Sequence, residues 1–138
     1  SIDCVVGNNC IIGNSTKFAG EVIIDDCAII SGSVLVHQFT RIGGFVMVQG
    51  GSRTSRDIPP YCIAGKEPIR YCGLNLVGLR RRGFSNEIID NIGQAYRIIY
   101  SHGLVKEGIE EVKANVPMSK EIEYVIKFFE ESQRGVIR

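Results

Sequence analysis

The strongest constraint on the fold is a period of six residues near the start of the chain. One apolar series recurs at every sixth position: Val6, Ile12, Phe18, Ile24, Ile30, Val36, Ile42 and Val48. Four residues after each of these stands a small or β-branched residue: Cys10, Thr16, Val22, Ala28, Val34, Thr40, Val46 and Ser52. This period fits neither the 3.6-residue turn of a helix nor the two-residue alternation of a strand. It is typical of a parallel β-helix, in which three units of strand and corner close one coil of about 18 residues.

The repeat breaks after Arg53, and helical spacing follows. The segment 58–68 contains Pro59 and Pro60, which have no backbone N–H to donate, so we expect an extended strap that leaves the last coil. Helices are expected over 76–82, from a Ser85 N-cap to about Gly103, over 105–115, and from a Ser119 N-cap to about Gly135. The predicted fold class is mainly β plus α, with a parallel β-helix and its strap over 1–68 and a helical C-terminal domain over 69–138.

Composition excludes several classes of function. The 15 acidic and 16 basic residues nearly cancel, which argues against a nucleic-acid binder driven by overall charge. No apolar run approaches the ~18 residues of a membrane span, and the first residues do not have the pattern of a signal peptide, so a cytoplasmic protein is expected. The five cysteines form no C-x-x-C pair, which indicates free thiols rather than a zinc site. We expect no metal and no cofactor.

Stacking of coils places residues 18 apart in columns, and three neighbouring columns share one edge of the prism: Ser1, Ala19 and His37; Ile2, Gly20 and Gln38; Asp3, Glu21 and Phe39. His37 follows an inward Val36, so its side chain is expected to point outward. A lone surface histidine is usually inert, but Gln38 adds a donor and an acceptor suited to sugar or pyrophosphate oxygens. Gly20 has two interpretations: a corner that needs positive φ, or close approach of a ligand to its N–H.

A dense basic run at Arg80, Arg81 and Arg82 is the other candidate site. It can be a solvated helix C-terminus, or a site for phosphate groups, which guanidinium groups bind in pairs of hydrogen bonds. The start of the chain is a third feature. The repeat is already in phase at Val6, so the first coil would expose an unpaired rung; we expect a C-terminal part of a longer protein, or another chain that covers this end.

Several strings resemble one family. The segments "AGEV", "VHQF", "DIPPY", "GLNLVGLRRRGFS" and "RGVIR", set in a hexapeptide repeat, resemble the acyl-carrier-protein-dependent UDP-N-acetylglucosamine O-acyltransferases, which begin lipid A synthesis. The resemblance covers essentially the whole chain and somewhat more than half of a typical member. It implies a homotrimer of left-handed parallel β-helices that moves an (R)-3-hydroxyacyl chain from acyl carrier protein to the 3-hydroxyl of UDP-N-acetylglucosamine.

The resemblance also assigns roles to residues. The Gly20 N–H matches the oxyanion donor, and His37 and Gln38 match residues that contact the UDP-sugar. Further matches are to the acyl-pantetheine and phosphate positions at Asn75, Arg81 and Arg82, and to the small residue at the end of the acyl groove at Gly50.

At three positions the resemblance bears directly on catalysis. The general-base histidine of the family falls on Ile2, which cannot accept a proton. Asp3 matches the residue after that histidine, and Glu21 stands where well-known members carry a second histidine. The chain is therefore interpreted as an incomplete or altered version of an active enzyme. The alternatives are a non-catalytic member that binds nucleotide sugar or carrier protein, and a related N-acyltransferase that acts later in the pathway.

Overall fold

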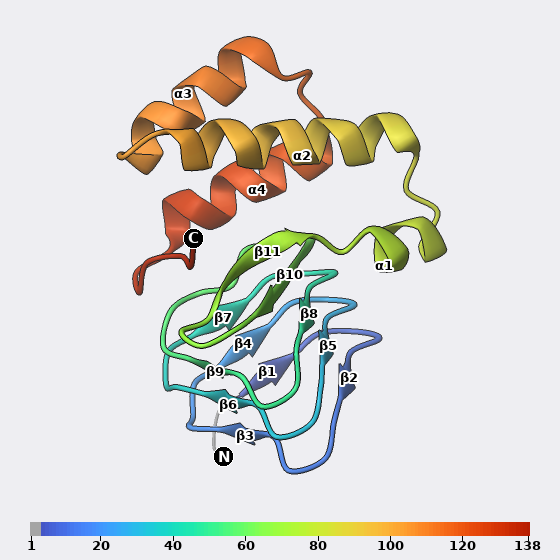
Figure 1. Cartoon of the computed structure of the whole chain (residues 1–138), viewed down its shortest axis with the longest axis vertical. Helices are drawn as coiled ribbons and strands as arrows, with labels where there is room; N and C mark the ends of the chain where they lie inside the picture. Colours follow the sequence, from blue (N-terminus) through green and yellow to red (C-terminus); the bar gives the residue numbers. More distant parts are fainter. Residues whose placement is uncertain (1–3) are drawn as a thin grey trace. The chain divides into compact units, whose positions relative to one another are not determined.

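The computed structural model describes residues 4–138, and its first part is a parallel β-solenoid of about three turns (Figure 1). Two-residue strands recur every six residues: β1 (Val5–Val6), β2 (Ile11–Ile12), β3 (Lys17–Phe18), β4 (Ile23–Ile24), β5 (Ile29–Ile30), β6 (Leu35–Val36), β7 (Arg41–Ile42), β8 (Met47–Val48) and β9 (Arg53–Thr54). They form three walls with the strand orders β1-β4-β7, β2-β5-β8 and β3-β6-β9. Each strand from β1 to β6 pairs in parallel with the strand 18 residues later, as Phe18 does with Val36. The predicted stacking at a spacing of 18 is therefore confirmed for these strands, whereas residues 1–3 of the columns lie outside the described residues.

The solenoid core is made by the two series of the six-residue repeat. In the upper coils both series are almost fully buried: Ile24, Ile30, Val36, Ile42 and Val48 from the first, and Val22, Ala28, Val34, Thr40, Val46 and Ser52 from the second. Toward the beginning of the described chain burial falls, and Val6 is 45% and Ile12 is 40% exposed. Each two-residue strand has one inward and one outward side chain. The strand thus supplies the large inward residue of each unit, and the position four residues later supplies the small one.

The expectation that residues 58–68 leave the solenoid is wrong for its central part. Ile58 forms a parallel bridge with Ile42, and β10 (Cys62–Gly65) pairs in parallel with β8. The spacing here is 16 residues instead of 18, because the corner between β9 and Ile58 is two residues shorter than the corner between β6 and β7. Pro59 and Pro60 lie in the next corner, between Ile58 and β10. Prolines are tolerated at this corner because no ladder N–H is required there. Strand β11 (Arg70–Leu74) then pairs antiparallel with β10 and ends the sheet.

The end of the chain returns to the solenoid. Helix α4 stops at Glu131, earlier than the expected Gly135. Val136 forms a parallel bridge with Asp57, and the Asp57 N–H donates to the carbonyl of Gly135 at 2.8 Å. Ile137 is 3% exposed and belongs to the solenoid core. Residues 132–138 are called the tail below.

By its contacts the chain divides into two compact units. The first is the solenoid unit, with the described residues up to Asn75 together with the tail; the second is the helical unit, Leu76–Glu131. We expected the division at residues 68 and 69 instead, and β11 and the tail account for the difference. No helix in the described residues is both long and apolar enough to cross a membrane.

The helical unit has the four expected helices, α1 (Leu76–Arg81), α2 (Asn86–Ser101), α3 (Val105–Asn115) and α4 (Lys120–Glu131). Ser85 and Ser119 cap α2 and α4: their hydroxyls accept the N–H of Ile88 and Ile122, respectively, each at 3.2 Å. The buried faces hold Ile89, Ile92, Ala95, Tyr96 and Ile99 of α2, Ile109 and Val112 of α3, and Ile122, Val125, Ile126, Phe128 and Phe129 of α4. These apolar stripes hold α2, α3 and α4 together as one small core (Figure 1).

Candidate functional site

Four of the predicted site residues lie on one edge of the solenoid, where the chain leaves β3 and β6. The N–H of Ala19 donates to the Val36 carbonyl at 3.0 Å, and one coil higher the N–H of His37 donates to the Thr54 carbonyl at 3.0 Å. The chain therefore turns at equivalent positions in both coils. Its side chains come from Glu21, His37 and Gln38, all exposed, around the backbone of Gly20.

Gly20 has both a positive φ, which a tight corner requires, and a backbone N–H without a described partner, which a ligand contact requires. Its φ is +116°, a value that side chains rarely tolerate, so the corner needs glycine. Its carbonyl accepts the N–H of Phe39 at 3.4 Å, whereas its own N–H makes no hydrogen bond within residues 4–138. Gly20 is buried, and its N–H is a backbone donor without a partner among residues 4–138, at the corner that adjoins His37 and Gln38. A backbone donor of this kind can stabilise an oxyanion.

The side chains of His37 and Gln38 have no polar partner in the part of the chain that the structure describes. Both are exposed, and neither side chain makes a hydrogen bond or an ion pair with any other described residue. The backbone of the corner is fixed, since the His37 carbonyl accepts the N–H of Thr40 at 3.3 Å. By contrast His102, the other histidine, ends α2 and has its Nε2 2.9 Å from Glu111 Oε1. Of the two histidines, His37 is the one available to a ligand.

The remaining predicted residues lie elsewhere. Gly50 is exposed at a different corner, after β8, where it stacks on Gly32. Asn75 is 6% exposed, and its Nδ2 donates to the carbonyl of Phe45 at 3.1 Å, so it also holds the corner before β8 in place. Arg81 and Arg82 are exposed and belong to the helical unit. Ile2 and Asp3 lie outside the described residues.

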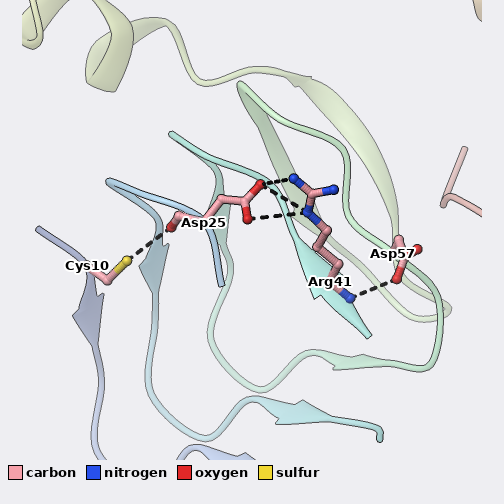
Figure 2. Close-up of polar contacts among 4 residues, drawn as sticks. All are labelled: Cys10, Asp25, Arg41 and Asp57. Carbon is pink, nitrogen blue, oxygen red and sulfur yellow. Dashed lines mark hydrogen bonds and ion pairs between the residues drawn. The ribbon is translucent and has the colours of Figure 1, made fainter. Parts of the chain in front are cut away.

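A partly buried polar network in the wall β1-β4-β7 is absent from the sequence prediction. Arg41 follows the corner that carries His37, and its guanidinium contacts both carboxylate oxygens of Asp25, the closest pair being Nη2 and Oδ2 at 2.9 Å. The Arg41 N–H donates to Asp57 Oδ1 at 2.8 Å, and the thiol of Cys10 donates to the Asp25 carbonyl at 3.1 Å. Figure 2 shows Arg41 between the two carboxylates. The signal in the sequence is the spacing of 16 residues from Asp25 to Arg41 and from Arg41 to Asp57. A search for columns at a spacing of 18 does not find it.

Burial makes the thiol of Cys62 an unusually weak acid. Cys62 is fully buried in β10, and its thiol donates to the Pro59 carbonyl at 3.2 Å. Desolvation, with a smaller contribution from the neighbouring Cys72, raises the pKa of the Cys62 thiol far above its ordinary value of 9.0. A thiol held neutral in this way is a core residue and not a nucleophile.

Coils stacked at a spacing of 18, with a turning edge that presents a backbone donor, a histidine and a glutamine, define a hexapeptide-repeat protein with a candidate site for a polar ligand. Residues 57–137 match the family model described as UDP N-acetylglucosamine O-acyltransferase, domain 2. The chain belongs to this family.

Relatives agree with this assignment. The acyl-carrier-protein UDP-N-acetylglucosamine O-acyltransferase of Burkholderia orbicola is 42% identical over 99% of this chain and 54% of its own length. The enzyme of the same name from Aliivibrio salmonicida is 38% identical over 99% of this chain and 52% of its own length. The crystal structure of LpxA, a UDP-N-acetylglucosamine acyltransferase from Bacteroides fragilis, superposes with a TM-score of 0.96 at 64% identity and covers 99% of this chain and 54% of that one. The chain therefore spans about half the length of the relatives that it matches.

Proposed function

We propose that this chain is part of an acyltransferase that moves an (R)-3-hydroxyacyl group from acyl carrier protein to the 3-hydroxyl of UDP-N-acetylglucosamine, the first step of lipid A synthesis. The observation that carries the proposal is the edge formed by Gly20, His37 and Gln38 in a chain of the UDP-N-acetylglucosamine O-acyltransferase family. In this reaction the sugar oxygen attacks the thioester carbonyl, an ester bond forms, the carbon–sulfur bond breaks, and the carrier leaves as a thiol.

The solenoid edge contributes binding and charge stabilisation to this reaction. The Gly20 N–H, which has no partner within residues 4–138, stabilises the oxyanion that develops on the thioester carbonyl. His37 and Gln38 hold the nucleotide sugar through hydrogen bonds, with Glu21 on the same edge. Asp3 is a further proposed contact of the sugar. The remaining proposed contacts are Gly50 with the end of the acyl chain, and Asn75, Arg81 and Arg82 with the pantetheine and phosphate groups.

Proton removal from the sugar hydroxyl needs a base, and Ile2 supplies none. A well-placed general base accelerates transfer by about 10²–10⁴-fold. We therefore expect slow transfer from the protein with Ile2, and a gain of that order when a histidine replaces it. A protein that binds the nucleotide sugar without transferring the acyl group is the second candidate, and Ile2 is the observation that favours it.

The proposal includes a homotrimer, an acyl carrier protein as partner and a cytoplasmic location. The outward side chains of β2, β5, β8 and β10 are all apolar: Ile11, Ile29, Met47 and Ile63. A continuous apolar column on one wall supports burial against another copy of the chain. The exposed Arg81 and Arg82 suit an acidic carrier, and the five free cysteines suit a reducing compartment.

The test is product formation by the complete protein, with radiolabelled UDP-N-acetylglucosamine and a 3-hydroxyacyl carrier protein. Ile2→His is expected to raise the rate, and His37→Ala to weaken nucleotide-sugar binding at least tenfold. His102→Ala is the matched control, because it removes the other histidine from a position in the helical unit. If neither the parent nor Ile2→His forms product while both bind the nucleotide sugar, the chain is a binding protein and the proposed activity is wrong. A preference for an acylated glucosamine acceptor would instead identify an N-acyltransferase.

A further inference from the structure

A cavity of about 430 Å³ in the solenoid unit is lined by arginines that the proposed reaction does not use. Arg53 comes from β9 and Arg56 from the corner after it, Arg70 begins β11, and Arg138 ends the tail. The other lining residues are Ser55, Glu67, Pro68, Ile69 and Ile137. Three separate segments of the chain thus bring four arginines to the lining of one cavity.

The backbone around this cavity is held in place. Thr54 Oγ1 donates to the carbonyl of Arg56 at 2.7 Å and accepts the N–H of the same residue at 3.3 Å, which fixes the corner. The N–H of Tyr71, in β11, donates to the carbonyl oxygen of Arg138 at 3.1 Å. Arg134 Nε adds a hydrogen bond to the Ser55 carbonyl at 3.1 Å. The positions from which the arginines extend are therefore built into the fold.

The positive side chains of the lining outnumber the negative ones. Arg53, Arg56 and Arg70 line the cavity together with one acidic residue, Glu67. Arg53, Arg56 and Arg70 form no ion pair or side-chain hydrogen bond with any residue from 4 to 138. Like charges brought together repel one another, and an anion in the cavity would relieve that repulsion.

We propose that this cavity is an anion site for a diphosphate-bearing small molecule. Planar guanidinium groups bind phosphate oxygens through paired hydrogen bonds, and a single carboxylate or phosphate would use only part of this set. The volume lies within the range of small-molecule sites, and Ile69, Pro68 and Ile137 supply an apolar wall for the organic part of the ligand. The cavity begins one coil above the candidate site, since Ser55 follows β9 as His37 follows β6. The proposal holds whether or not the chain transfers acyl groups.

Titration calorimetry with inorganic diphosphate tests the proposal. The double variant Arg53→Gln/Arg70→Gln is expected to weaken the affinity at least tenfold and to reduce its dependence on salt, because two phosphate contacts are lost. Arg97→Gln, an exposed arginine of α2, is the matched control and should change the affinity less than twofold.

Two results would overturn this inference. An equal loss in Arg97→Gln and in the double variant would mean that diphosphate responds only to the total charge of the chain. A loss in His37→Ala as large as in the double variant would place the diphosphate on the His37 edge. Neither result depends on acyl transfer, so the failure of the proposed activity would leave the test of the cavity intact.

Discussion

Replacing Asp57 by alanine should release the tail from the solenoid. Asp57 is 4% exposed, and its two carboxylate oxygens accept hydrogen bonds from the Arg41 N–H at 2.8 Å and the Ser132 hydroxyl at 2.6 Å. Its main chain continues the same contact, since the Ile137 N–H donates to the Asp57 carbonyl at 3.0 Å. One buried side chain therefore joins the third coil to the tail.

The magnitude follows from the bonds that are lost. A hydrogen bond to a charged group contributes about 1.5–3 kcal/mol, and the desolvation of the buried carboxylate offsets part of the total. We expect Asp57→Ala to lower the free energy of unfolding by about 3 kcal/mol. With a urea dependence of about 1.5 kcal/mol per molar, the unfolding midpoint should fall by about 2 M. Asp57→Asn keeps an oxygen for the Arg41 N–H and should cost less than half as much.

The assay is urea unfolding followed by circular dichroism, with limited trypsin digestion as a local readout. Trypsin should cut after Arg134 much faster in Asp57→Ala, because the tail no longer rests on the solenoid. Asp90→Ala makes the same substitution at an exposed position of α2 and should leave both readouts unchanged. A midpoint for Asp57→Ala within about 0.3 M of that control would refute the argument from the carboxylate contacts.

Two further predictions concern the upper coils. Gly43→Ala would place a Cβ 2.5 Å from the backbone nitrogen of Pro60, so it should destabilise the chain by about 1–3 kcal/mol in urea unfolding, while Gly103→Ala, in open space, serves as the control. For Cys62, the folded state holds the thiol neutral, so the unfolded state loses its proton first as the pH rises above the ordinary value of 9.0, and stability is full below that pH and falls above it. Cys62→Ala should flatten this alkaline loss of stability, and an unchanged slope would show that other groups cause it.

Much of the fold is local information that the sequence carries directly. The six-residue period determines which side chains face inward, because a short strand and a corner repeat identically in each unit. It also determines which residues stack in columns, so the sequence alone assigns Gly20, His37 and Gln38 to one edge. The helices were equally predictable, because Ser85 and Ser119 mark their starts and apolar residues repeat at helical spacing.

The tertiary structure decided the features that depend on pairing between distant segments. The two prolines suggested an exit from the solenoid, yet the last coil continues with a spacing of 16, because a proline is costly only where a ladder N–H is needed. Two features leave no periodic signal in the sequence. One is the return of the tail to Asp57, and the other is the group of arginines that β9, β11 and the tail bring to the cavity. A repeat specifies contacts between equivalent positions, whereas these contacts join segments that are not equivalent, and only the folded chain determines which of them meet.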